Sequence, residues 1–350
     1  MSTRVTRLAA PNAKVRALAA ELLSREEKRS LIVAATFDDA VHQLTGTVYR
    51  RYLGEGVAGL SNLFLLEKAL QRGLVDAYER LLWALAGGLY ALVLEMLRRF
   101  EVDNLQVILR GLATAVPDEE IRSLLVPLGR YERLPIAALL AAPAIGDAVA
   151  ALDGLPYAGV LRNALDRYRR EGTLFVIEVA LDLDYYRRLW STMGALPGRD
   201  RIEAAELLGM RYDVINVEWM LRYKALYHLS PEEIFNYTLP AGYRVRDDTV
   251  RRVADAADLR EAIAALPEPY RSLLLPLAGE EAPWRLEVAL RHWLWGTARR
   301  AMGGYPFRVG AILGFLALKE AEVHDIRAIL EGKQSGRGPE EIETFLWGEA

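Results

Sequence analysis

The chain repeats one helical segment three times, and this repeat restricts its possible folds more than any other feature of the sequence. The copies are FEVDNLQVILRGLATAVPDEEI (100–121), MRYDVINVEWMLRYKALYHLSPEEI (210–234) and KEAEVHDIRAILEGKQSGRGPEEI (319–342). Aligned without gaps, they superimpose the acidic residues Glu101, Asp213 and Glu322, which lie 112 and 109 residues apart. A unit that recurs at such a period predicts one structural element built three times.

Two other segments recur with nearly the same period and extend the repeat to most of the chain. An apolar-Glu-x-Ala-Leu pattern occurs as LEKAL (66–70), IEVAL (177–181) and LEVAL (286–290). A segment that ends in tyrosine occurs as DAVHQLTGTVY (39–49), DAVAALDGLPY (147–157) and the looser EAIAALPEPY (261–270). We therefore predict three homologous helical domains of about 110 residues each, namely 1–138 with an extra N-terminal helix, 139–248 and 249–350.

The hydrophobic pattern predicts an all-α fold. Apolar residues recur at helical intervals, and alternation with a period of two is nearly absent, so we expect few strands. In the repeated helix the apolar positions are i, i+3 and i+4, which forms a stripe that must be buried against neighbouring helices. The stripe consists of Leu105, Ile108 and Leu109; Val217, Met220 and Leu221; and Ile326, Ile329 and Leu330.

The polar residues of the repeated helix allow two interpretations. Glu101, Asp213 and Glu322 are expected near the start of the helix, where the macrodipole favours a negative charge. Asn104 and Asn216 precede the apolar stripe by one residue and are expected to bond a nearby backbone group. These residues serve either packing and capping within the fold or the binding of a partner.

Composition excludes several classes of site. The net charge of −3 gives no general attraction to nucleic acid or anionic lipid. The absence of cysteine excludes disulfides, thiolate metal sites and cysteine nucleophiles. The most apolar run, 81–97, contains Glu95 and is shorter than the about 20 residues that a bilayer crossing needs. We therefore expect a buried core helix there and a soluble chain that does not insert into the membrane.

Motifs for catalysis are also missing from the sequence. The four histidines lack metal-ligand spacing, and neither a phosphate-binding glycine loop nor a G-x-S-x-G motif occurs. Asp38 and Asp39 resemble the aspartate-rich magnesium motif of terpene cyclases, but His42 stands at the position of its third carboxylate and no second metal motif follows. We expect no catalytic residue, metal or cofactor.

The ordered landmarks resemble a known family. They are NAKVRALAAELLSREE with FDDAVHQLTGTVY, EVDNLQVILRG, YDVINVEWMLRYKALY with SPEEI and LPAGY, and FLALKEAEVHDIRAILEGKQSGRGPEEI, all of which lie within 12–346. This set is similar to the C subunits of bacterial and archaeal V/A-type (vacuolar-type) ATPases, whose eukaryotic relative is the d subunit of the V-ATPase. The resemblance implies three helical domains arranged as a pseudo-threefold funnel.

The resemblance also implies a mechanical function. Members of this family are non-catalytic parts of the central stalk, present in one copy per complex. They form a socket that links the central shaft, made of the D and F subunits, to the proteolipid rotor ring and transmit torque for ATP-coupled proton or sodium transport. The implied location is cytoplasmic and peripheral to the membrane, with no nucleic-acid partner.

Ten residues match the family signature and are candidates for a partner interface. The third copy departs from the pattern, because it has Asp325 in place of asparagine and Glu331 in place of arginine. The candidates are Glu101, Asp103, Asn104, Arg110, Asp213, Asn216, Arg222, Lys319, Glu320 and Glu322.

The alternative function is that of a generic α-helical scaffold that binds other proteins along a concave face. Solenoid scaffolds are typically built from repeats of about 20–50 residues, and a unit of about 110 residues is too long for that pattern. The repeat length therefore favours three closed lobes over an open superhelix.

Overall fold

A computed structural model describes residues 2–53, 62–239, 242–279 and 284–349. No strand occurs in these ranges, which confirms the predicted all-α class. Pro240 and Ala241 of the LPAGY landmark lie outside the described residues. The chain forms two compact units, one of residues 86–195 and one that combines 1–85 with 196–350.

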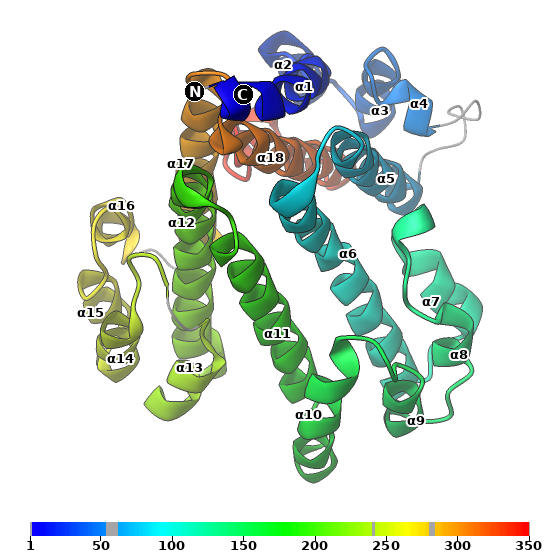
Figure 1. Ribbon diagram of the computed structural model, residues 1–350, viewed down its shortest axis with the longest axis vertical. Coiled ribbons are helices and arrows are strands. Elements are labelled where there is room, and N and C mark those ends of the chain that lie inside the picture. Colours follow the sequence, from blue (N-terminus) through cyan, green and yellow to red (C-terminus); the bar gives the residue numbers. More distant parts are fainter. Residues whose placement is uncertain (1, 54–61, 240–241, 280–283, 350) are drawn as a thin grey trace. The chain divides into compact units, whose positions relative to one another are not determined.

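The unit of residues 86–195 is built on two long helices that pack along each other, α6 and α11 (Figure 1). Shorter helices pack beside them and carry the segment that ends in Tyr157. The helices are α6 (Gly87–Ala113), α7 (Asp118–Leu124), α8 (Ile136–Leu140), α9 (Ile145–Ala150), α10 (Tyr157–Glu171) and α11 (Phe175–Gly194).

The repeated segment lies on α6 and, in the other unit, on α12 and α18; these three are called the long helices below. Both α12 and α18 pack against α17. The N-terminal helices of this unit are α1 (Ser2–Ala19), α2 (Arg25–Val33), α3 (Phe37–Thr45), α4 (Arg50–Leu53) and α5 (Leu63–Leu82). The later helices are α12 (Gly198–Arg222), α13 (Pro231–Tyr237), α14 (Asp247–Asp255), α15 (Leu259–Ala264), α16 (Tyr270–Leu274), α17 (Trp284–Gly303), α18 (Val309–Gln334) and α19 (Pro339–Glu343).

The predicted apolar stripe is confirmed in all three copies. Each of its nine side chains is at most 5% exposed, because the stripe faces the neighbouring helices. The expected position of the acidic residues was wrong: Glu101, Asp213 and Glu322 lie well inside their helices. The helices begin further upstream because apolar residues at helical spacing, such as Leu92 and Met96 in α6, continue the buried face.

The most apolar run of the sequence does not form one helix. It is divided between the end of α5 at Leu82 and the start of α6 at Gly87. Gly87 has φ of +58°, a left-handed conformation that glycine adopts without strain. Leu81 and Leu92, on either side of this break, are buried as expected, whereas Trp83 beside it is 74% exposed. None of the helices in the described ranges is long and apolar enough to span a membrane.

The three long helices end in related ways. After each one a single residue adopts a left-handed conformation: Ala115, His228 and Gly336. The next amide donates back to the helix, from Val116 to the Gly111 carbonyl at 3.0 Å and from Arg337 to the Gly332 carbonyl at 2.9 Å. Such a bond satisfies a carbonyl that the helix itself leaves without a partner.

The second copy contains one extra residue at this point. Gly111 contacts Ile121 and Gly332 contacts Ile342, ten residues further on, so closely that a Cβ atom would meet the isoleucine within 2.6 Å. In the second copy the matching pair is Tyr223 and Ile234, which are eleven residues apart. There α12 continues as a π-helix, η3 (Tyr223–Tyr227), whose wider turn accommodates one additional residue.

The helices that pack around α18 include several from the N-terminal part of the chain. α18 packs against α2, α3 and α5, and one core cluster combines residues from both ends of the chain, such as Leu31 and Leu44 with Ile326 and Leu346. The predicted domain boundaries after residues 138 and 248 stay predictions. The contacts group α6 and α12 each with the tyrosine-ending segment that comes after it in the sequence. In contrast, α18 is grouped with the segment 39–49, which comes long before it.

Candidate functional site

Each long helix buries one carboxylate that accepts a hydrogen bond from a tyrosine. The hydroxyl of Tyr157 lies 2.6 Å from Glu101. The matching distances are 2.9 Å from Tyr270 to Asp213 and 2.7 Å from Tyr49 to Glu322. The three carboxylates are at most 5% exposed. These are the tyrosines that end the three recurring segments, and we refer to the three pairs as the carboxylate–tyrosine pairs.

The first and third carboxylates are neutralised by basic side chains. Glu101 accepts hydrogen bonds from Arg98 and from Arg133, whose Nη2 lies 2.8 Å away. Glu322 accepts one from Lys319 Nζ at 2.7 Å. Buried charged side chains in proteins are generally paired in this way.

Asp213 is stabilised differently. It accepts hydrogen bonds from the backbone amides of Tyr243, Arg244 and Val245 at 2.9, 2.8 and 3.1 Å. Within the described ranges no basic side chain forms an ion pair with it. Burial raises the pKa of Asp213 despite these amides. Burial and the neighbouring Asp213 charge likewise raise the pKa of Tyr270.

The two asparagines fix the chain that follows each helix. Asn104 donates to the Val126 carbonyl at 2.7 Å and accepts from the Val126 amide at 2.8 Å. Asn216 makes the same pair of bonds with Leu239, at 3.0 and 2.7 Å. An amide side chain has one donor and one acceptor for this purpose, so it can bind both backbone groups of one residue. Both asparagines bond to the backbone, as expected, but their partners lie 22 and 23 positions further along the chain.

The backbone groups around Asp325 account for the aspartate that replaces asparagine in the third copy. Asp325 faces two donors, the amides of Trp347 at 2.7 Å and Gly348 at 3.1 Å. A carboxylate accepts at both oxygens, so aspartate suits this backbone better than asparagine. Lys28 Nζ lies 2.8 Å from the same carboxylate. Burial alone would raise the pKa of Asp325, but the bonds from His324 and Lys28 outweigh burial and lower it.

The arginine of the signature binds the glutamate of the apolar-Glu-x-Ala-Leu segment. Arg110 pairs with Glu178 at 2.6 Å, and Arg222 pairs with Glu287 at 2.9 Å. In the third copy Glu331 replaces the arginine and lies near Glu67. Burial, and then the Glu331 charge, raise the pKa of Glu67, while the nearby Arg327 opposes this change.

The remaining signature residues also have partners within the fold. Asp103 pairs with Arg99 at 2.8 Å, and Glu320 accepts bonds of 2.6 Å from Tyr78 and from Arg211. Six signature residues are buried and make internal contacts. The other four reach the surface to some degree, and for them a partner contact stays a prediction. The buried six are Glu101, Asn104, Asp213, Asn216, Lys319 and Glu322.

Sequence reasoning missed the carboxylate–tyrosine pairs. The tyrosines end a recurring segment and the acids begin another, so both halves were visible in the repeat. Their pairing joins residues as far apart as Tyr49 and Glu322, which no local pattern indicates.

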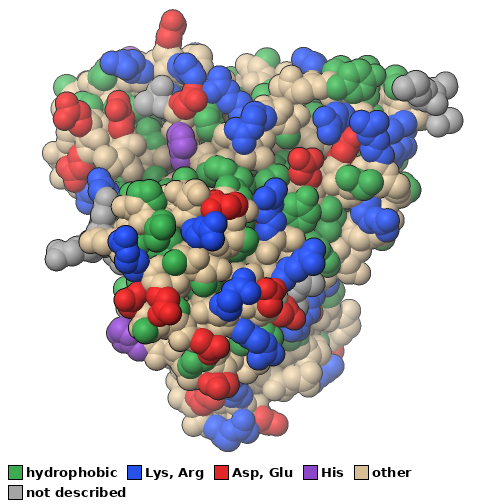
Figure 2. All heavy atoms as spheres, turned by 90° about the vertical axis from the view of Figure 1, so that its left-hand side faces the viewer, with side chains coloured by type: hydrophobic (Ala, Val, Ile, Leu, Met, Phe, Trp, Pro, Cys, Tyr) green, Lys and Arg blue, Asp and Glu red, His purple; other side chains and the backbone are tan. Residues whose placement is uncertain are grey.

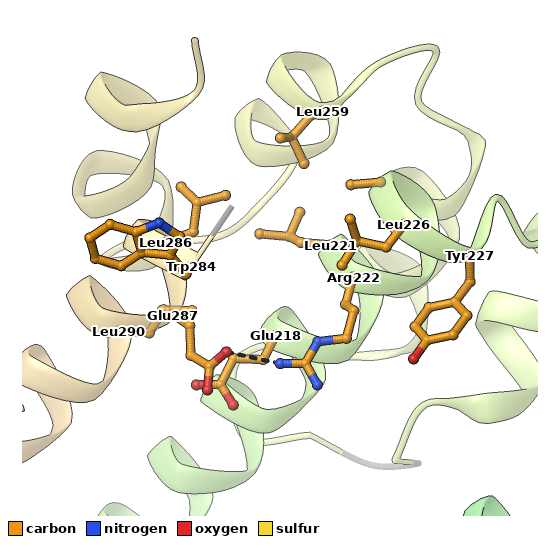
Figure 3. A pocket seen from close by; sticks show the side chains of 11 residues that line it. Glu218, Leu221, Arg222, Leu226, Tyr227, Leu259, Trp284, Leu286, Glu287 and Leu290 are labelled. Atoms are coloured by element: carbon orange, nitrogen blue, oxygen red, sulfur yellow. Dashed lines mark hydrogen bonds and ion pairs between the residues drawn. The ribbon is translucent and has the colours of Figure 1, made fainter. Parts of the chain in front are cut away.

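A groove of about 370 Å³ lies where α12 passes into η3, between that region, α15 and α17 (Figure 3). Its walls are mainly apolar, and Leu226, Tyr227 and Trp284 at its rim are 58%, 55% and 38% exposed. Figure 3 shows Arg222 reaching Glu287 along one side. The groove can hold apolar side chains. Among the described residues no group of three or more acidic or histidine side chains is placed to bind a metal ion.

The family of the chain follows from its overall match to known proteins. A family model described as ATP synthase (C/AC39) subunit matches residues 11–345. The chain belongs to this family. The long helices, the carboxylate–tyrosine pairs and the groove all lie within the matched residues.

Individual members of the family are similar to this chain over most of their length. The C subunit of the A-type ATP synthase from Methanocaldococcus jannaschii is 28% identical over 341 residues, which cover 96% of this chain and 85% of that protein. The corresponding protein of Halorubrum lacusprofundi is 31% identical over 291 residues, with 81% of each chain covered. That of Archaeoglobus fulgidus is 27% identical over 336 residues, with 95% and 94% covered.

Proposed function

We propose that this chain is the non-catalytic central-stalk component of a V/A-type rotary ATPase, one copy per complex. It forms a socket that links the central shaft of the D and F subunits to the proteolipid ring and transmits torque for ATP-coupled proton or sodium transport. The match of the family model to residues 11–345 carries this proposal. The protein works in the cytoplasm at the membrane surface, without inserting into the bilayer.

The internal contacts support a rigid joint. Buried carboxylates with several fixed bonds, and asparagines that bind the following backbone, hold each long helix to its neighbours. A close-packed helical interior transmits strain with little compression. Torque transmission therefore needs packing rather than a reactive group, a metal or a cofactor.

The way the chain closes on itself supports the proposed funnel of three domains. The segment 25–85 completes the copy that begins at α18, so the last copy is built from both ends of the chain. A row of three lobes would leave the first and last copies separate, whereas a closed set of three brings them together. We propose the closed, pseudo-threefold arrangement on this basis.

The surface charge supports protein partners rather than nucleic acid. Figure 2 shows acidic and basic side chains interspersed on the face where α14, α15 and α16 lie in Figure 1. A nucleic-acid surface would concentrate basic residues on one face. Together with the net charge of −3, the pattern agrees with contacts to other proteins of the complex.

A binding experiment tests the proposal. The tagged chain is mixed with purified D and F subunits and, separately, with the detergent-solubilised proteolipid ring. We expect both to be retained at a ratio of one chain per ring, with no ATP hydrolysis by the chain alone. Retention of neither partner would contradict the proposed function.

A further inference from the structure

A second hollow, of about 360 Å³, lies between α12, α17 and the start of α18. Arginines from three different elements line it. Arg244 precedes α14, Arg300 lies near the end of α17, and Arg308 is the residue before α18. We refer to this hollow as the arginine pocket. None of the ten signature residues lines it.

Two of the three guanidinium groups lack a carboxylate partner among the described residues. Arg300 donates to the Thr297 hydroxyl at 2.9 Å, and Arg244 donates to the Glu268 carbonyl at 3.2 Å. These bonds to neutral oxygens leave the charges uncompensated. Other arginines, such as Arg110 and Arg222, instead pair with an acid.

The third arginine shares its acid with others. Arg308 Nε lies 3.3 Å from Glu203, which also pairs with Arg4 at 2.8 Å and Arg199 at 3.2 Å. The same Nε is buried and makes no hydrogen bond within the described ranges. Glu203 also accepts a hydrogen bond from the amide of Val309 at 3.0 Å, so its two carboxylate oxygens are shared among three arginines and one amide.

The charged residues that line the pocket indicate the charge of the ligand that fits it. The three arginines and two glutamates, Glu203 and Glu206, give the lining a net charge of +1. One carboxylate neutralises this lining, whereas a phosphate with two charges would leave it with an excess of negative charge. A carboxylate can bind a guanidinium group through two parallel hydrogen bonds, as a phosphate also can, so the total charge decides between them. Leu207, Met210 and Trp293 line the same pocket and suit the aliphatic part of a side chain.

We propose that the arginine pocket receives an acidic side chain, glutamate or aspartate, from a neighbouring protein of the complex. This inference rests on the proposed function, because it needs a protein partner in the assembly. It adds a charged contact to the joint and assigns it to residues outside the family signature.

Charge reversal tests the contact in the assembled complex. A tagged chain replaces the native copy in its own cells, and the complex is purified in mild detergent at increasing salt. Arg300→Glu should reduce the amount of complex retained about tenfold at moderate salt, because it places like charges together. Glu206→Gln should shift retention to higher salt, because it removes a competing negative charge.

The matched control is Arg260→Glu, an exposed α15 residue outside the pocket with the same change of charge. It should behave like the unchanged chain. Thermal unfolding of each purified variant excludes misfolding, since Arg300 is exposed and makes only a local bond. Equal losses for Arg300→Glu and Arg260→Glu would overturn the proposed contact.

Crosslinking identifies the occupant. A photoreactive benzoylphenylalanine replaces Ala301, which lines the pocket, and in the control it replaces Arg260. We expect an Ala301 crosslink to a peptide of another protein in the complex, one that contains glutamate or aspartate. A crosslink to lipid only, or none in an assembled complex, would overturn the inference. If the unchanged chain fails to join any rotary complex, the proposed function fails first.

Discussion

The first and second copies of the repeat differ in how they stabilise the buried acid and in how the end of the helix packs against the isoleucine that follows it. In the first copy arginines neutralise the buried acid Glu101, and Gly111 lets Ile121 approach the helix. In the second copy backbone amides surround Asp213, and a π-helical turn at Tyr223 accommodates an additional residue. The repeat thus specifies which positions must touch, while the chemistry of each contact varies.

The largest expected effect comes from removing the charge of Glu101, the buried acid that arginines bind in the first copy. Glu101→Gln removes the charge that neutralises Arg98, which is buried. Leaving a buried charge without its partner costs about 3–5 kcal/mol. Denaturant unfolding measures the loss, with Glu119→Gln on the exposed start of α7 as the control. A loss below about 1 kcal/mol would show that water and the Tyr131 carbonyl, to which Arg98 also donates, compensate for the lost charge.

The tyrosine bond should matter more where no basic side chain assists. Tyr270→Phe removes one of four donors to Asp213, and a hydrogen bond to a charged group contributes about 1.5–3 kcal/mol. Tyr157→Phe should cost less, because Arg133 and Arg98 still bind Glu101. The unfolding free energies of both variants test this order. A larger loss for Tyr157→Phe would reverse our view of the two copies.

Replacing Gly111 of the first copy should have a smaller effect on stability. A second glycine-to-alanine substitution, expected to change stability in the opposite direction, serves as its control. In Gly111→Ala the added Cβ would lie 2.4 Å from Ile121 Cδ1, and such overpacking costs about 1–3 kcal/mol. Gly159→Ala in α10 meets no atom within 4 Å and should stabilise the chain by about 0.5–1 kcal/mol. Thermal unfolding of both variants distinguishes steric conflict from a general effect of alanine.

The effect of pH should separate Asp213 from Asp325. The folded pKa of Asp213 is raised above 3.8, so its contribution to stability is full below that pH and declines as pH rises. The folded pKa of Asp325 is lowered, so its contribution is present above pH 3.8 and is lost as pH falls further.

Unfolding measured from pH 3 to 7 tests these signs. The stability difference between the unchanged chain and Asp213→Asn should shrink as pH rises, whereas the difference from Asp325→Asn should grow. The same slope for both variants would contradict the opposite pKa directions. The two substitutions act as controls for each other because both replace a buried aspartate.

Much of the fold could be predicted from the sequence because the governing pattern is local. The stripe through Leu105, Val217 and Ile326 repeats every helical turn, and its burial is confirmed. That Asn104 and Asn216 bond to backbone was expected from their residue type, but their partners, 22 and 23 positions away, were not indicated by the sequence. The starts of the long helices were less clear, because the buried face continues upstream of the repeated segment.

The contacts between distant segments could not be predicted from those patterns. Nothing near Tyr49 indicates that its hydroxyl binds Glu322, since that pairing depends on how the whole chain closes. The arginine pocket has the same origin: Arg244, Arg300 and Arg308 come from three elements, and only the fold brings them together.

The joining of both chain ends in the last copy has a consequence for protein synthesis. Residues 25–53 leave the ribosome before residues 309–346, the segment against which they pack. Apolar side chains such as Leu31, Ile32 and Leu44 therefore cannot pack against the residues of α18 until the intervening residues have been translated. This segment therefore reaches its final packing late although it is made before α18, and its apolar side chains stay accessible to chaperones during that time.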